Sequence, residues 1–215
     1  MSRKLILFLL VISFVTILLF RPPDAFSQFS AASCAVGAKN FDEVVPGFYR
    51  GGKPSLADLE KLHEIGVKTI IDFTMANRQA ERDKARVLGM KYVNIPWDTD
   101  TWMTWFYDYN RVSKKFFSLI EDPSNLPIYV HCFSGRDRTG MMVALYRMRT
   151  EGWSFEQAFA EMKRYGHEES TYPNLAQHLR KAERELKAHP FALKPPVPPA
   201  AGTRLFQHSI EEQNA

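Results

Sequence analysis

Two kinds of hydrophobic pattern alternate along the middle of the chain. Short runs rich in β-branched and aromatic residues predict strands over residues 48–50, 67–73, 92–95 and 127–131. Longer segments with apolar residues three or four positions apart predict helices over residues 56–65, 77–88, 105–120, 139–150, 155–165 and 175–187. Strands that alternate with helices predict an α/β fold, a central mainly parallel sheet flanked by helices. We assign this body to residues 41–190.

A different pattern opens the chain. Residues 5–20 follow two basic residues and carry no charge, and as a helix they would span about 24 Å, less than the roughly 30 Å of a hydrocarbon core. Residues 1–40 are therefore expected to hold a secretory signal peptide or membrane anchor and a linker. Cleavage after Ser27, retention as an anchor and lipidation at Cys34 remain open. Each of them places the body outside the cytoplasm, as a secreted, periplasmic or membrane-anchored domain.

Composition and charge exclude several classes of protein. The chain has two cysteines in 215 residues, too few for a disulfide scaffold or a zinc site of four cysteines. The net charge is +4, but the basic excess lies mostly in residues 1–40, so the nearly neutral body does not indicate a nucleic-acid binder. Residues 191–215 form a proline-rich tail, which we expect to be extended and disordered.

Candidate chemistry lies in the loop after the last predicted strand, where parallel sheets bind their ligands. The loop reads His131-Cys132-Phe133-Ser134-Gly135-Arg136-Asp137-Arg138-Thr139-Gly140, and a helix follows it. If this loop curls back on itself, its backbone N–H groups form an anion nest, and the positive end of the helix points to the same place. Gly135 permits the curvature, and Arg138 offers a planar fork for two phosphate oxygens.

The thiol of Cys132 would lie at the floor of this nest. Amides, a helix end and an arginine together favour its thiolate form. A thiolate that faces a bound phosphate is a nucleophile placed for attack on phosphorus. The same groups would stabilise the charge of the transition state.

This loop resembles the signature of the cysteine-dependent protein tyrosine phosphatase superfamily, His-Cys-(five residues)-Arg-(Ser/Thr)-Gly. The body has the size of the compact dual-specificity branch. Its opening, Gly47 to Ser55, and its strand Thr69-Ile70-Ile71-Asp72 are similar to those of atypical bacterial and plant members. Where those relatives often continue with Leu-Arg, this chain has Phe73-Thr74.

The resemblance implies a role for each residue of the loop. Cys132 would be the nucleophile that forms a phosphocysteine intermediate, and Arg138 would clamp the phosphate. Thr139 would assist departure of the thiolate, and His131 would order the loop. The phosphate would lie against residues Phe133, Ser134, Gly135, Arg136, Asp137 and Arg138. This mechanism needs neither a metal nor a cofactor.

The general acid is less sharply defined. The family places an Asp on a loop upstream of the signature, where Asp98 and Asp100 are the candidates, and Asp98 is favoured. Either could instead be a helix cap or a turn carboxylate. Asp137 is a third candidate, because related loops that carry an Asp at this place use it as the acid. Arg136 beside it would favour acidic or multiply phosphorylated substrates.

Several functions remain open at this point. The expected substrates are proteins that carry phosphotyrosine, phosphoserine or phosphothreonine, and phosphoinositides or inositol polyphosphates are the alternative. Trp97 and the aromatic residues that follow it could form a wall for such a substrate, although core packing is the more common use of such spacing. Alternatives of other classes are a membrane-anchored, non-catalytic phosphate-binding module and a rhodanese-like sulfurtransferase. The latter would not need Arg138 and the following Thr-Gly.

Overall fold

The computed structural model describes residues 36–98, 102–170 and 172–188, with side chains omitted for 102–108. The predicted leader and tail lie outside these residues, as does Asp100. Among the described residues, none of the helices has both the length and the apolar character that a membrane crossing requires.

Five strands form one sheet in the order β1-β2-β5-β3-β4. Their bounds are Asp42–Val45 (β1), Phe48–Gly51 (β2), Thr69–Asp72 (β3), Lys91–Asn94 (β4) and Ile128–His131 (β5). Strands β2, β5, β3 and β4 are parallel, whereas β1 pairs with β2 as an antiparallel edge. The predicted mainly parallel sheet is thus confirmed, but β1 was not expected, because its run of four residues is short and begins with two acidic residues.

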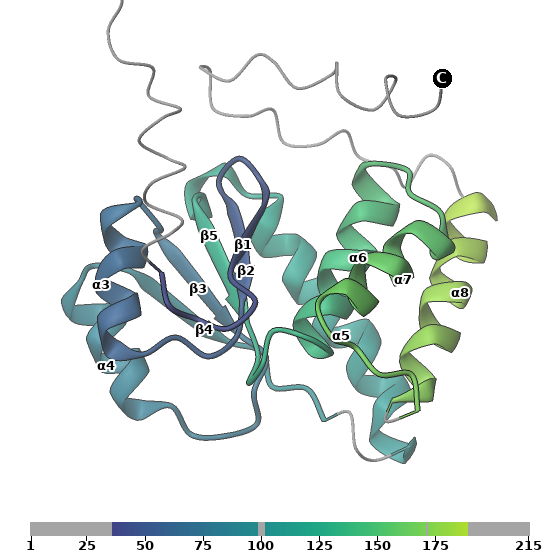
Figure 1. Ribbon diagram of the computed structural model, residues 1–215, viewed down its shortest axis with the longest axis horizontal. Coiled ribbons are helices and arrows are strands. Elements are labelled where there is room, and N and C mark those ends of the chain that lie inside the picture. Colours follow the sequence, from purple (N-terminus) through teal and green to yellow (C-terminus); the bar gives the residue numbers. More distant parts are fainter. Residues whose placement is uncertain (1–35, 99–101, 171, 189–215) are drawn as a thin grey trace, which may run out of the picture. The chain divides into compact units, whose positions relative to one another are not determined.

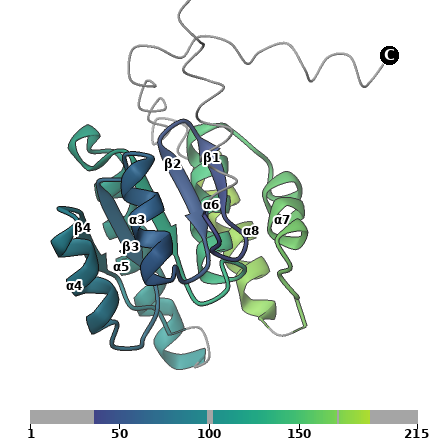
Figure 2. The ribbon, with the colours of Figure 1, turned by 60° about the vertical axis from the view of Figure 1, so that its left-hand side comes forward.

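Helices cover both faces of the sheet (Figure 1). They are α3 (Leu56–Glu64), α4 (Gln79–Val87), α5 (Trp102–Ile120), α6 (Arg138–Thr150), α7 (Phe155–Arg164) and α8 (Pro173–Ala188), with a short 3₁₀ turn at Pro123–Asn125. Figure 2 shows α3 and α4 together on one side of the strands, with α6, α7 and α8 together on the other. All six predicted helices are present, and their ends differ from the predicted ones by a few residues.

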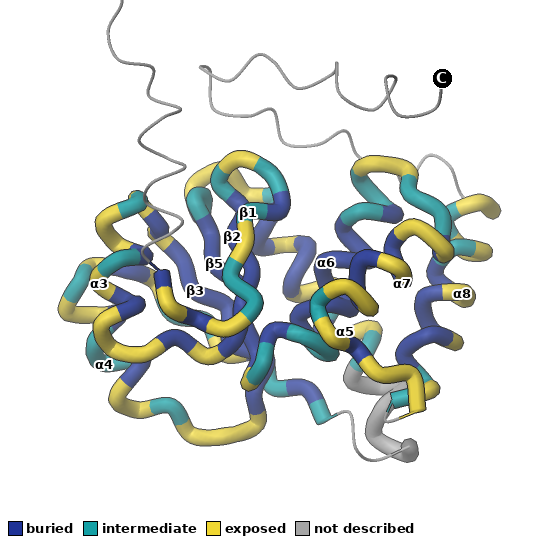
Figure 3. Tube along the Cα trace, viewed as in Figure 1, coloured by how far each residue is buried: buried dark blue, intermediate teal, exposed yellow. Residues whose placement is uncertain are grey.

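Alternation along the strands builds two separate cores. Tyr49, Ile70 and Tyr129 point to one face, where they pack with buried residues of α3 and α4. Phe48, Ile71, Val130 and their neighbours point to the other face, towards α5, α6, α7 and α8. In Figure 3 strands β2, β3 and β5 and most of α6 are buried, whereas the edge strands β1 and β4 are mostly half-buried or exposed, as are the outer sides of the peripheral helices.

The parallel strands end together at one edge of the sheet. Gly51 and Asp72 both lie opposite His131 in the register, and Asn94 lies opposite Asp72. The carboxyl ends of four strands lie along this edge, and β5 is one of the two central strands among them. The fold therefore surrounds the loop after His131 with the ends of neighbouring strands on both sides.

Candidate active site

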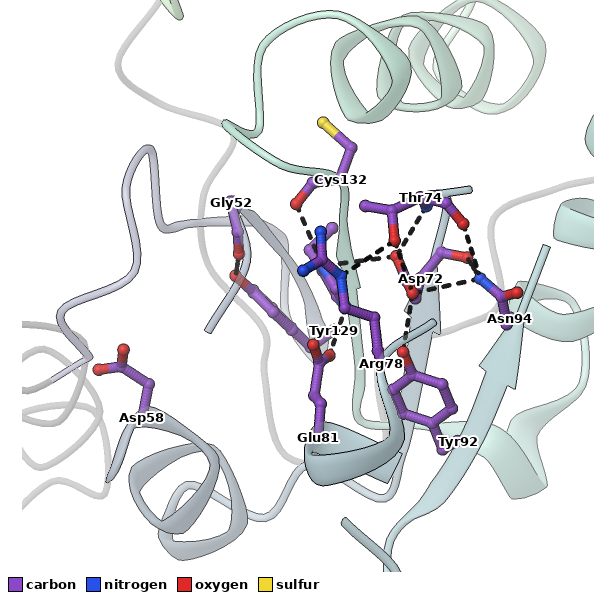
Figure 4. A network of polar contacts seen from close by, with 12 residues as sticks. Gly52, Asp58, Asp72, Thr74, Arg78, Glu81, Tyr92, Asn94, Tyr129 and Cys132 are labelled. Atoms are coloured by element: carbon purple, nitrogen blue, oxygen red, sulfur yellow. Dashed lines mark hydrogen bonds and ion pairs between the residues drawn. The ribbon is translucent and has the colours of Figure 1, made fainter. Parts of the chain in front are cut away.

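The loop of residues 132–137 joins the end of β5 to the start of α6. Cys132, its first residue, is a free cysteine with only 3% of its surface exposed. Figure 4 shows its sulfur pointing away from the polar residues beside β3 and β4. The thiol is thus held at the base of the loop rather than at its rim. We call residues 132–137 the phosphate loop.

The phosphate loop turns through Gly135, whose φ angle is +74°. A Cβ atom at this position would lie 2.6 Å from the carbonyl carbon of Gly51 and 2.7 Å from the amide nitrogen of Gly52. Gly135 is therefore required twice, for its left-handed backbone and for the close approach of the end of β2.

Residues at and just after the end of β2 support the phosphate loop through hydrogen bonds. The Nη2 atom of Arg50 donates to the carbonyl of Gly135 at 2.6 Å, and the amide of Lys53 donates to the carbonyl of Phe133 at 3.1 Å. The buried hydroxyl of Thr139 donates to the carbonyl of Gly51 at 3.5 Å. The loop carbonyls that make these bonds point outward, towards β2.

The amides of residues 133–138 are free for a ligand. Within the described part of the chain, they donate to no backbone or side-chain acceptor. The Nε atom of Arg138, the first residue of α6, is also buried without an acceptor among the described residues. Unsatisfied donors of this kind attract an anion, and the N-terminus of α6 adds its dipole.

A second set of contacts holds the outer side of the phosphate loop. The side-chain amide of Asn40 donates to the carbonyls of Ser134, at 2.9 Å, and Tyr165, at 3.0 Å. The carboxylate of Asp137 lies 2.8 Å from Nδ1 of His167, a buried histidine just after α7. The loop is therefore joined to both the N-terminal segment and the α7–α8 connection.

His131 lies beneath the phosphate loop between acidic groups. Its Nε2 atom is 2.8 Å from a carboxylate oxygen of Glu81 on α4, and its Nδ1 atom is 3.2 Å from the carbonyl of Cys132. The ring stacks on Tyr129, with centroids 5.7 Å apart. The hydroxyl of Tyr129 in turn donates to the carbonyl of Gly52 at 2.5 Å. The orientation of His131 is therefore fixed from several sides.

Asp72 is the centre of a buried polar network next to His131 (Figure 4). Its carboxylate accepts hydrogen bonds from the amide of Thr74 at 2.7 Å, the hydroxyl of Tyr92 at 2.7 Å and the side chain of Asn94 at 3.2 Å. Burial and, next, the Asp72 charge raise the pKa of Tyr92, so its phenol stays a donor. The network ties the ends of β3 and β4 together.

Of the two upstream acid candidates, the structure describes Asp98 but not Asp100. Asp98 is half-buried and follows Trp97, whose side chain is fully buried in the core. The amide of Trp97 donates to the carbonyl of Phe73 at 3.3 Å, which keeps this segment beside the end of β3. Asp98 therefore lies at the same edge of the sheet as Cys132, whereas Asp100 lies outside the described residues. Trp97 is a core residue and not part of an exposed aromatic wall.

Sequence reasoning assigned no role to four residues whose side chains contact the phosphate loop or its flanking histidine. They come from parts of the chain that are distant in sequence, and they are Asn40, Arg50, Glu81 and His167. An arginine within a buried strand is unusual enough to have signalled Arg50. Glu81 and His167 carry no comparable signal, because polar helices and isolated histidines are common.

Comparison with known proteins places this chain among phosphatases. The family described as "PTP-NADK: DSP-PTPase phosphatase fused to NAD+ Kinase" matches residues 28–178. The dual specificity protein phosphatase TpbA of Pseudomonas aeruginosa is 28% identical over 127 residues, which cover 59% of this chain and 55% of TpbA. The inositol diphosphatase SIW14 of Saccharomyces cerevisiae is 26% identical over 141 residues, or 59% of this chain and 45% of SIW14. This chain thus spans about half the length of these two relatives.

The fold of the solved SIW14 catalytic core is also similar. The two structures superpose with a TM-score of 0.58 at 21% sequence identity, over 72% of this chain and 94% of the other. At this identity the likeness concerns the fold. It shows that a mainly parallel sheet with this arrangement of helices recurs among such phosphatases.

Replacement of Gly135 by alanine is expected to damage the site as well as the fold. The added Cβ cannot fit against the end of β2, so the phosphate loop must move. We expect Gly135→Ala to lose stability and to lose most of its activity towards a phosphate ester, measured by urea unfolding and phosphate release. Gly152→Ala is a matched control, since Gly152 has φ +71° but nothing within 4 Å of its Cβ position. It should lose about 1–2 kcal/mol and keep its activity; equal loss of activity in both variants would contradict this account.

Proposed function

The chain belongs to the DSP-PTPase phosphatase family, and from this premise we propose that it hydrolyses phosphate monoesters on proteins through a phosphocysteine intermediate. The proposed substrates carry phosphotyrosine, phosphoserine or phosphothreonine. The observation that carries the proposal is the juxtaposition of a buried thiol at Cys132 with six free loop amides and the unsatisfied Nε of Arg138.

The reaction proceeds in two steps. The thiolate of Cys132 attacks phosphorus, an S–P bond forms, and the ester P–O bond breaks while Asp98 gives its proton to the leaving oxygen. Water then attacks the phosphocysteine, Asp98 takes a proton from it, and the S–P bond breaks to release inorganic phosphate and the thiolate. The hydroxyl of Thr139 turns from its long bond to the Gly51 carbonyl and donates to the departing sulfur. Arg138 and the loop amides hold the phosphoryl oxygens in both steps.

Asp98 is the proposed acid because its segment follows β4 and lies beside the end of β3, upstream of the phosphate loop. Asp137 lies against His167, at 2.8 Å, and so acts as a tether of the phosphate loop to the α7–α8 connection. Asp72 is fully buried, and its carboxylate accepts hydrogen bonds from Thr74 and Tyr92. Asp98 is half-buried at the carboxyl edge of the sheet, where it can reach a substrate.

An exposed aromatic residue at the rim of the site favours protein substrates. Phe133 is 71% exposed within the phosphate loop itself and offers an apolar surface to the ring or side chain of a phosphorylated residue. The relative TpbA is named a dual specificity protein phosphatase.

Inositol phosphates are the second candidate substrates. Lys53 is exposed next to the phosphate loop, and Arg136 is half-exposed within it, so two cations besides Arg138 stand near the entrance. Such cations favour a substrate with several phosphates. The relative SIW14 is named an inositol diphosphatase.

We also propose that the phosphatase acts outside the cytoplasm. The support for this comes from the charged start and short apolar run of residues 1–20.

Turnover by the intact chain is the first test of the function. We expect phosphate release from phosphopeptides, and its loss in Cys132→Ser, because a hydroxyl lacks the nucleophilicity of a thiolate. Parallel assays with inositol polyphosphates and phosphoinositides identify the preferred class. Activity on inositol substrates alone would replace the proposed substrates by the second candidate. Unchanged turnover in Cys132→Ser would refute the mechanism.

The identity of the acid is tested by the dependence on the leaving group. Asp98→Asn should lower kcat on phosphoserine peptides by about 10²–10⁴-fold, because a serine alkoxide needs the proton. The loss should be much smaller on p-nitrophenyl phosphate, whose phenolate leaves without help. Asp137→Asn and Asp100→Asn serve as comparisons. If either of these, and not Asp98→Asn, showed the leaving-group dependence, the choice of Asp98 would be wrong.

The location is tested by the fate of the N-terminus. We expect the full chain, expressed in a bacterium, to be exported and to begin after Ser27 when its N-terminus is determined by mass spectrometry. A chain that starts at residue 36 is the control and should stay in the cytoplasm. Recovery of the full chain from the cytoplasm with residues 1–35 attached would contradict the proposal.

A further inference from the structure

A second arginine lies under the phosphate loop. Arg50 belongs to β2, on the face of the sheet that carries Ile71 and Val130. Only 1% of its surface is exposed, which makes it one of the largest fully buried side chains among the described residues. It comes from the sheet, whereas Arg138 is the first residue of α6.

The guanidinium of Arg50 makes few contacts for a buried cation. Its Nη2 donates to the carbonyl of Gly135 at 2.6 Å, and its plane lies over the ring of Tyr165, 3.6 Å from the centroid. Its Nε and Nη1 atoms are buried with no acceptor among the described residues. No ion pair of Arg50 with a carboxylate occurs in that part of the chain either.

The acidic groups nearest to Arg50 are already engaged. Asp42 accepts a hydrogen bond from the hydroxyl of Tyr165, and Glu161 pairs with Arg147 at 3.1 Å. Burial lowers the pKa of Arg50, and the charges of Tyr165, Glu161, Cys132 and Asp42 oppose that effect only in part. An arginine nevertheless stays charged in a protein.

A buried charge without a paired anion lowers stability. Even a buried ion pair can often be replaced by apolar side chains of similar volume with no loss of stability, and an unpaired charge has less to offset its burial. The stability of the fold alone therefore does not account for Arg50. What does lie close to it is the phosphate loop, which the proposed mechanism fills with negative charge.

We propose that Arg50 is a positioning residue of the phosphate loop, whose positive charge is balanced by the Cys132 thiolate and by the phosphoryl group bound above it. Through Nη2 it holds the Gly135 carbonyl away from the centre of the loop, so that the neighbouring amides face inward. Its remaining donors keep a positive field beneath the anion. This inference rests on the proposed function, since it assumes that the loop binds a phosphoryl group.

The inference predicts opposite effects on stability and on anion binding. In Arg50→Met the full chain should unfold at the same temperature as the wild type or higher when no oxyanion is present. The rise in unfolding temperature that tungstate gives the wild type should be lost or much reduced. For p-nitrophenyl phosphate, KM should rise and kcat should fall, with kcat/KM lower by about a hundredfold.

A matched control separates this effect from the general loss of an arginine. Arg149 lies near the end of α6, pairs with Glu121 at 2.7 Å and stacks on Phe117. Arg149→Met should keep the tungstate shift and the wild-type KM and kcat, with at most a small loss of stability.

The outcomes distinguish this inference from the proposed function. A destabilised Arg50→Met that keeps the wild-type tungstate shift, KM and kcat would show a structural role only and overturn the inference. If Arg50→Met does not fold, Arg50→Lys decides, since a lysine cannot reproduce both the fork and the stacking. A reduced tungstate shift and raised KM support the inference, and wild-type values overturn it. If the wild type binds tungstate through Arg50 but hydrolyses no phosphate ester, the proposed function fails while the role of Arg50 stands.

Discussion

The site depends on a loop that keeps its backbone amides unpaired while its carbonyls are satisfied. A short loop can do this only if other elements take up the carbonyls, because a free loop would pair its own groups or expose them to water. Here Arg50 and the amide of Lys53 donate to these carbonyls from the side of β2, and Asn40 donates from the segment before β1. These contacts hold the loop with its amides turned away from protein acceptors, which is the arrangement that the proposed anion binding requires.

Much of this fold follows from local pattern. The buried parallel strands are continuous β-rich runs, and the helices have regular apolar spacing, so the sheet and its six helices were predicted and are confirmed. The resemblance to cysteine-dependent phosphatases is likewise confirmed. Strand β1 escaped prediction because its four residues are only partly buried and gain their order from pairing with β2. Strand β1 is stabilised by its pairing with β2, and no local sequence pattern indicates this pairing.

The site, too, has a part that a local pattern predicts and a part that depends on tertiary contacts. The residues of the phosphate loop are contiguous, so the spacing of Cys132, Gly135 and Arg138 indicated their chemistry directly. Arg50 and His167 contact that loop from positions 85 and 30 residues away from their partners. Such contacts depend on strand order and on where a connection returns to the sheet. Neither is encoded in a local pattern, and sequence alone therefore describes the loop but not the side chains that hold it.

At the carboxyl ends of the strands, the two faces of the sheet carry buried side chains of opposite charge. On the side of α4, the Asp72 carboxylate accepts hydrogen bonds from neutral donors, and the Glu81 carboxylate lies 2.8 Å from Nε2 of His131. On the side of α6, Arg50 keeps buried donors with no acceptor among the described residues. The buried cation therefore lies on the α6 side of the sheet, and these buried carboxylates lie on the α4 side. Because interactions across a protein interior are weakly screened, a buried cation at this place favours an anion in the loop, as the proposed function requires.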